Sequence, residues 1–125
     1  MEYDAFKVRK LLDDFLEDAR NSTVLVEGKK DRKSLEELSV PSENIVEIHQ
    51  GKNLADLISE LEGKKFIIMT DSDRTGASLK KELHSLLLAE GKKVNIEYRS
   101  DFRKLAGVKF VERMSTQLRD ILDSR

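Results

Sequence analysis

A chain of 125 residues has the size of one domain, and it can bury roughly two-thirds of the surface that its unfolded form exposes. Its formal net charge of −1 excludes a chain that binds nucleic acid through overall basicity, so any such contact needs a local basic patch or bound cations. The absence of cysteine excludes disulfides, thiolate metal sites and cysteine nucleophiles. Without a membrane-length apolar run or a signal-peptide core, we expect a cytoplasmic protein with no membrane partner.

Apolar residues recur at intervals that predict helices and strands in alternation. Helical spacing predicts helices over 3–19, after Gly28, from Asn53, over 75–90 and after Gly107. Short apolar runs, several of them β-branched, predict strands at 23–27, 44–48, 65–70 and 94–98. Asn53 is the expected N-cap of the middle helix, Gly63 its expected C-cap, and Gly91 the expected end of the next helix.

This order of elements predicts an α/β fold. Strands that alternate with helices form right-handed βαβ units, so we expect one domain over residues 1–125 with a central four-stranded parallel sheet and helices on both faces. The strands at 23–27 and 65–70 are the most apolar, and we place them side by side in the centre. The first and last helices are expected to cover the sheet or to form a dimer contact, so both monomer and dimer stay open.

Three acids follow these two central strands. Glu27 ends the first, and Asp71 and Asp73 come directly after the second, so all three are expected in one crevice at the carboxyl edge of the sheet. Each acid alone is explained as a loop residue or a helix N-cap. Three together repel one another unless a cation neutralises them, and hard carboxylate oxygens favour Mg²⁺, with Mn²⁺ as a substitute. One ion or two are compatible with this set.

Glycines and basic residues flank the acids. Gly28 and Gly76 are expected to allow close backbone approach, and free N–H groups at the helix start near Gly76 suit a phosphate, although both glycines also fit ordinary turns. Lys29 and Arg74 lie within the two motifs, and we expect them to bind phosphate. Further basic residues nearby are also expected to contact phosphates. The alternative is that their side chains lie on a solvated helix face. These residues are Lys30, Arg32, Lys33, Lys80 and Lys81.

Three other residues lie near the predicted crevice. Asp31 is a candidate for a supporting carboxylate just outside the metal ligands. His49 ends the second strand, where solvation is a simpler interpretation than a role in the site. Tyr98 is expected at a strand end, as a packing residue rather than a nucleophile.

The two motifs together resemble the signature of the Toprim family. The segments Val-Leu-Val-Glu-Gly-Lys-Lys-Asp at 24–31 and Ile-Met-Thr-Asp-Ser-Asp-Arg-Thr-Gly at 68–76 match its glutamate-glycine after the first strand and its Asp-x-Asp after the third. The resemblance covers 23–98 as the Toprim core, between the flanking helices, and implies the Rossmann-like Toprim fold. It also implies Mg²⁺ at Glu27, Asp71 and Asp73, and a general acid–base role for Glu27 at a phosphodiester.

Within that family, the motifs are similar to those of the 5S ribosomal-RNA maturase, of primase Toprim domains and of small stand-alone archaeal Toprim proteins. In 125 residues we expect neither the tyrosine-bearing second domain of topoisomerases nor the zinc region of primases. Two functions follow: a Mg²⁺-dependent nuclease or RNA-processing enzyme acting on RNA or DNA, or a non-catalytic nucleic-acid-binding or regulatory module that works with a protein partner. The phosphatase pattern Asp71-x-Asp73-x-Thr75 is disfavoured, because it would lie on the third strand and leave Glu27 without a role.

Overall fold

The computed structural model describes residues 2–48 and 53–123, and the statements below concern these ranges. The elements follow one another as α1 (Ala5–Ala19), β1 (Thr23–Val26), α2 (Lys29–Glu37), η1 (Ser42–Asn44), β2 (Ile45–Glu47), α3 (Leu54–Glu60), β3 (Lys65–Ile68), α4 (Arg74–Ala89), β4 (Lys93–Asn95), α5 (Glu97–Ala106), η2 (Val111–Arg113) and α6 (Met114–Asp123). No helix in the described ranges is both long and apolar enough to cross a membrane.

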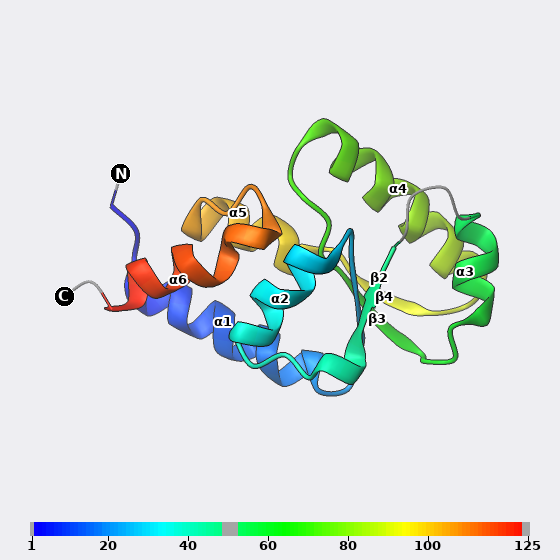
Figure 1. Cartoon of the computed structure of the whole chain (residues 1–125), viewed down its shortest axis with the longest axis horizontal. Helices are drawn as coiled ribbons and strands as arrows, with labels where there is room; N and C mark the ends of the chain where they lie inside the picture. The colour runs from blue at the N-terminus through cyan, green and yellow to red at the C-terminus, as the bar shows by residue number, and fades with distance from the viewer. Residues whose placement is uncertain (1, 49–52, 124–125) are drawn as a thin grey trace.

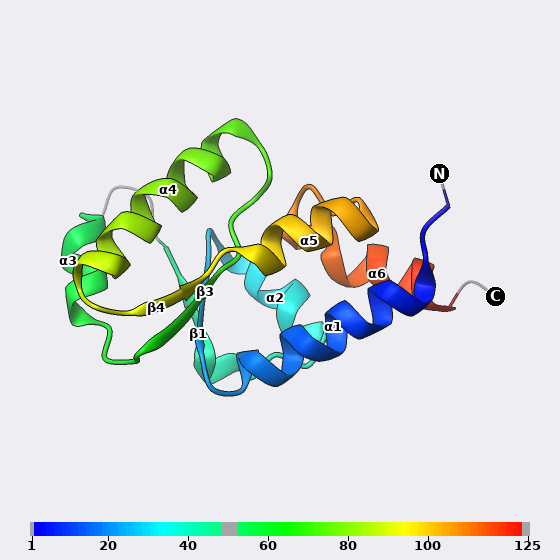
Figure 2. The ribbon, with the colours of Figure 1, turned by 180° about the vertical axis from the view of Figure 1, so that it is seen from behind.

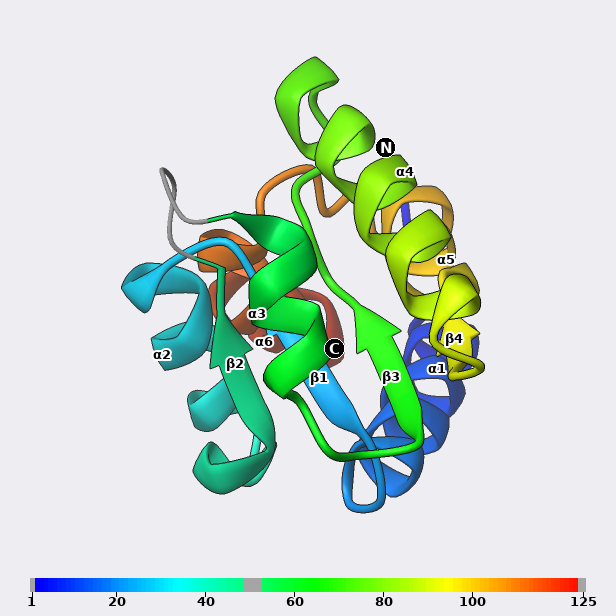
Figure 3. The same cartoon turned by 90° about the vertical axis from the view of Figure 1, so that its right-hand side faces the viewer.

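The four strands form one parallel sheet in the order β2-β1-β3-β4. The prediction that the two most apolar strands are central and adjacent is therefore confirmed, with Val24 paired to Ile67 in the register of β1 and β3. Figure 3 shows the sheet from the α3 side, with the segments that follow β1 and β3 leaving from the same edge. This edge carries the predicted site.

Helices cover both faces of the sheet, as predicted. On one side α1, α2, α5 and α6 form a thick layer, and on the other side α3 and α4 form a thinner one (Figures 1 and 2). The alternation of side chains along the strands explains this arrangement. Val24 and Val26 point into the larger core, whereas Leu25 points into the smaller one, and all three are fully buried.

Local signals define most helix starts. The side chain of Asp4 accepts a hydrogen bond from the Lys7 amide at 3.1 Å, so α1 begins at Ala5. Asn53 caps α3 as predicted and accepts from the Asp56 amide at 3.2 Å. The prediction for Gly63 is wrong, because α3 already ends at Glu60 and its C-cap, Leu61, is extended.

The segment after β4 differs most from the prediction. The expected strand over 94–98 is only Lys93–Asn95, and a helix that was not predicted, α5, begins at Glu97. Tyr98 therefore lies on a helix, where its hydroxyl donates to Asp18 and its ring packs edge-on against Phe15 at 5.4 Å between centroids. Its predicted role as a packing residue is consistent with these contacts.

Candidate metal and phosphate site

The sheet brings the two sequence motifs into direct contact. Glu27 follows β1, and its Oε2 accepts a hydrogen bond of 2.7 Å from the backbone amide of Asp71, which is 44 positions further along the chain. The approach is set by the sheet itself, since the Met69 amide still donates to the Leu25 carbonyl at 2.8 Å beyond the end of β3. The Glu27 side chain therefore lies beside the Asp-x-Asp segment.

Each of the three acids is oriented by a backbone amide. Glu27 is held by the Asp71 amide, Asp71 Oδ1 accepts from the Val111 amide at 2.8 Å, and Asp73 Oδ1 accepts from the Gly76 amide at 2.7 Å. Asp73 is thus also the N-cap of α4. Within the described ranges, the other carboxylate oxygen of each acid makes no hydrogen bond, and all three residues are only partly buried.

The acids influence one another electrostatically. The pKa of Glu27 is raised above its ordinary value mainly by burial, and the charges of Asp71 and Asp73 raise it further. Burial also raises the pKa of Asp71, while the Val111 amide and the Arg99 guanidinium counteract part of this increase. Ionising these carboxylates together is therefore unfavourable unless positive charge comes close.

Their chemistry fits a hard divalent ion. Three carboxylates, each oriented by an amide through one oxygen and with the second oxygen available, are the donors that Mg²⁺ prefers. As the side chains stand, however, no three acidic or histidine residues in the described part of the chain are grouped closely enough to enclose an ion. Metal binding by Glu27, Asp71 and Asp73 therefore stays a prediction, and it requires their side chains to turn toward one another.

The two motif glycines serve different purposes. A Cβ on Gly76 would stand 2.0 Å from the Asp71 carbonyl oxygen, so only glycine lets α4 start this close to the Asp71 backbone. The expectation of a free N–H here is wrong for Gly76, because its amide is engaged by Asp73. Gly28 is extended, and a Cβ there would meet nothing within 4 Å, so this position is open rather than crowded.

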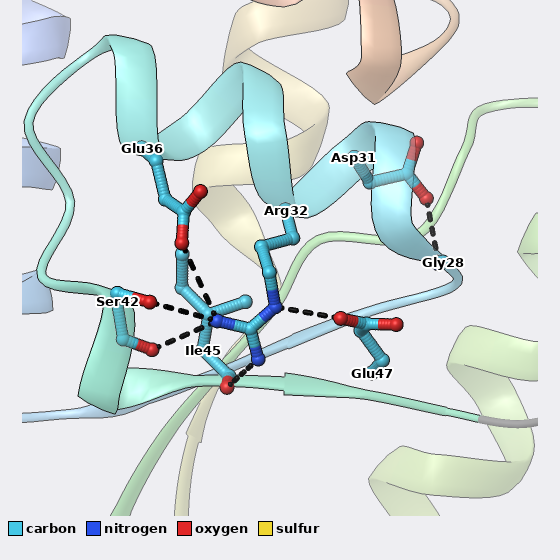
Figure 4. Close-up of polar contacts among 7 residues, drawn as sticks. All are labelled: Gly28, Asp31, Arg32, Glu36, Ser42, Ile45 and Glu47. Atoms are coloured by element: carbon cyan, nitrogen blue, oxygen red, sulfur yellow. Dashed lines mark hydrogen bonds and ion pairs between the residues drawn. The ribbon is translucent and has the colours of Figure 1, made fainter.

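The basic residues divide into two groups. Lys29 and Arg74 are the first residues of α2 and α4, and both are exposed next to the acids in sequence. Arg32 does not belong with them, because its Nε donates to Glu47 at 2.6 Å and its other nitrogens donate to the Ser42 and Ile45 carbonyls (Figure 4). Arg32 therefore ties α2 to β2, and its predicted phosphate contact is wrong.

Asp31 lies near enough to Asp71 to be influenced by its charge, which is consistent with the predicted place of a supporting carboxylate. Asp31 is 7% exposed, and its Oδ2 accepts a hydrogen bond of 3.1 Å from the Gly28 amide (Figure 4). This hydrogen bond caps the start of α2. Burial, followed by the charge of Asp71, raises the pKa of Asp31 to about 6. His49 lies outside the described residues.

Two features of the site were not predicted. Arg99, on α5, is 2% exposed; burial lowers its pKa to about 10, and the charges of Asp71 and Asp31 counteract part of this decrease. The segment from Val108 to Val111 runs beside Asp71 and supplies the amide that orients it. The spacing of Tyr98, Phe102 and Ala106 gives a helical signal for α5, but no local pattern indicates that the following segment returns to the site.

Comparison with known proteins matches the chain to the Toprim domain over residues 22–100, so the chain belongs to the Toprim family. Toprim domains usually bind metal ions and process nucleic acids. The chain is similar to a UPF0292 protein of Archaeoglobus fulgidus, with 36% identity over 87 residues, which covers 69% of this chain and 67% of the relative. It is 31% identical over 114 residues to a UPF0292 protein of Methanosarcina barkeri, covering 88% and 79% of the two chains.

A solved structure supports the same assignment. A putative protein from Aquifex aeolicus superposes with a TM-score of 0.73 and 28% sequence identity, covering 84% of this chain and 95% of that one. The resemblance to small archaeal Toprim proteins seen in the motifs is therefore confirmed.

Proposed function

We propose that this Toprim protein carries out Mg²⁺-dependent phosphoryl transfer on nucleic-acid phosphodiesters, most specifically nucleolytic processing of RNA. The observation that carries the proposal is the hydrogen bond between the Glu27 carboxylate and the Asp71 amide at the carboxyl edge of the sheet. It joins the two halves of the Toprim signature in one place.

In this proposal, Asp71, Asp73 and Glu27 hold the ion. A bound Mg²⁺ supplies positive charge that stabilises the phosphate as negative charge develops on it. Glu27 is also the group that would hold or move a proton, the general acid–base role that the resemblance to the Toprim family implies for it. Its orientation by the Asp71 amide keeps it at the sheet edge.

In this proposal, residues at the starts of α2 and α4 bind the phosphate. Lys29 and Arg74 are exposed, and each is one residue removed from a motif residue, Gly28 or Asp73. The open space beside Gly28 leaves room for a phosphate oxygen. Because the net charge of the chain is −1, these local cations and the proposed ion would supply the attraction that the chain as a whole lacks.

RNA is favoured over DNA by the likeness of the two motifs to those of the 5S ribosomal-RNA maturase.

A second candidate function is a non-catalytic nucleic-acid-binding module that works with a protein partner. The observation in its favour is that each acid is already engaged by a backbone amide and the three do not enclose an ion as they stand. The protein would then bind nucleic acid without cutting it.

Cleavage assays separate these candidates. End-labelled structured RNA, single-stranded RNA and duplex DNA would be incubated with purified protein in Mg²⁺, Mn²⁺ or EDTA. We expect RNA cleavage that EDTA abolishes and that Glu27→Gln lowers at least about 100-fold, a loss typical of a general acid–base group. Glutamine retains an oxygen for the Asp71 amide, so the fold should persist.

Asp13→Asn is the matched control, because Asp13 is an exposed acid on α1 whose side chain is 63% exposed. Its activity should equal that of the natural protein. Binding without cleavage on all three substrates would instead support the module. Cleavage that survives in Glu27→Gln would contradict the enzymatic proposal.

A further inference from the structure

The segment Val108–Val111 runs beside the loop that carries Asp71, and we name this segment the brace. Two hydrogen bonds join them: the Ser72 amide donates to the Lys109 carbonyl at 2.8 Å, and the Val111 amide donates to Asp71 Oδ1, also at 2.8 Å. The brace lies beyond residue 100, where the match to the Toprim domain ends. The orientation of a core motif residue thus depends on a segment outside that match.

Arg99 anchors the brace from inside the protein. Its Nη2 donates to the Val108 carbonyl, whereas its Nε and Nη1 have no hydrogen-bond partner among the described residues. A guanidinium that is 2% exposed and only partly hydrogen-bonded is costly, because burial removes its hydration. The adjacent charges that favour its ionised form are those of Asp71 and Asp31.

We propose that Arg99 is a positioning residue, which acts through the brace to fix the carboxylate of Asp71. Arg99 holds the Val108 carbonyl, and this fixes the brace. The brace in turn holds Ser72 and one oxygen of Asp71, so that Asp71 Oδ2 keeps a defined direction for a ligand. These hydrogen bonds do not depend on the proposed function. Their effect on a bound ion, however, rests on that function.

One substitution removes a single hydrogen bond between the brace and Asp71. Val111→Pro deletes the amide that donates to Asp71, and the local backbone accepts proline, because Phe110 is extended (φ −116°, ψ 126°) and Val111 is the first residue of η2. Val111→Ala is the matched control, since it retains the amide but loses more side-chain volume in the core than proline does. A purely structural role of Val111 would therefore make alanine at least as harmful as proline.

A second pair of variants tests the role of Arg99. Arg99→Met keeps the length and apolar stem but removes the donors and the charge, whereas Arg99→Lys retains one charged donor that can reach the Val108 carbonyl. The readout is hydrogen exchange of the Ser72 amide, measured by NMR against the amides of β1 in the same sample. We expect exchange at Ser72 to accelerate at least tenfold in Arg99→Met, and lysine to restore part of the protection.

The metal readout is Mn²⁺ affinity measured by electron paramagnetic resonance on folded protein. Loss of a group that orients a metal ligand typically weakens binding by about 10–100-fold, so we expect that loss for Val111→Pro and less than twofold for Val111→Ala. Equal affinities of the two variants, or unchanged Ser72 exchange in Arg99→Met, would overturn the inference. If the natural protein binds no Mn²⁺, the proposed ion fails, while Ser72 exchange still decides whether Arg99 fixes the brace.

Discussion

Replacing Asp31 by asparagine should stabilise the metal-free protein at neutral pH, although it removes an acid from the Glu-Gly-Lys-Lys-Asp segment of the first Toprim motif. Asp31 is 7% exposed and lies near the charge of Asp71, and its pKa is raised from 3.8 to about 6. The folded protein therefore binds the Asp31 proton more tightly than the unfolded chain does. Asparagine can still accept the hydrogen bond from the Gly28 amide through its side-chain oxygen.

The size of the effect follows from this difference. One pKa unit corresponds to 1.36 kcal/mol, so a rise of about two units makes ionised Asp31 destabilising by up to about 3 kcal/mol. The stability that the raised pKa provides is fully present below about pH 4 and is lost as the pH rises through about 6. Asp31→Asn should therefore match the natural protein near pH 4 and exceed it by roughly 1–3 kcal/mol at pH 8.

Urea unfolding followed by circular dichroism, in EDTA and at several values between pH 4 and pH 8, measures the two free energies of unfolding. The decisive quantity is the difference between them as a function of pH. A difference that stays constant across this range would refute the reasoning, as would an Asp31→Asn protein that is the less stable one at pH 8.

Four further substitutions test features described above by the same unfolding measurement. Gly76→Ala should destabilise by at least about 2 kcal/mol, because its methyl group would overlap the Asp71 carbonyl, whereas Gly28→Ala meets open space and should change stability by under about 0.5 kcal/mol. Arg32→Lys should cost about 1–3 kcal/mol, since lysine cannot reproduce the forked contacts between α2 and β2. Phe15→Ala should cost about 3–5 kcal/mol, because it empties a fully buried aromatic position in the larger core.

Neighbouring residues provide controls for the last two. Lys33 is exposed one position from Arg32, and Phe6 is 80% exposed on the same helix as Phe15, so alanine at either should be close to neutral. If Phe6→Ala were as destabilising as Phe15→Ala, the assignment of the core face of α1 would be wrong. If Arg32→Lys were neutral, the contacts in Figure 4 would contribute little to the link between α2 and β2.

Features set by local pattern were the ones that the sequence predicted well. The apolar β-branched run of β1 and the apolar run of β3 mark strands buried on both faces, and this placed them in the centre of the sheet. With the strands adjacent, parallel connectivity alone brings Glu27 near Asp71. Asn53 was predictable for a similar reason, because a cap depends on residues only three positions away.

What the sequence did not reveal depends on contacts between distant residues. Arg32 looks like its exposed lysine neighbours, and only the position of β2 shows that its guanidinium is engaged there. Arg99 is a charged residue in a segment for which no helix was predicted, yet it is 2% exposed, because α5 turns this side chain toward the brace. Gly63 fitted the spacing of a C-cap, but the chain leaves the helix in an extended conformation two residues earlier.

The thick helical layer has a consequence for how this protein can be divided. Phe15 of α1, Phe102 of α5 and Leu118 of α6 are fully buried in one cluster, and all three lie outside the matched range 22–100. A fragment trimmed to that range would keep only α2 of this layer intact and would expose part of the side of the sheet that carries Val24 and Val26, and such a surface promotes self-association. The matched range 22–100 is therefore shorter than the smallest fragment of this chain that we expect to fold. A fragment made to study the Toprim core should begin with α1 and end with α6.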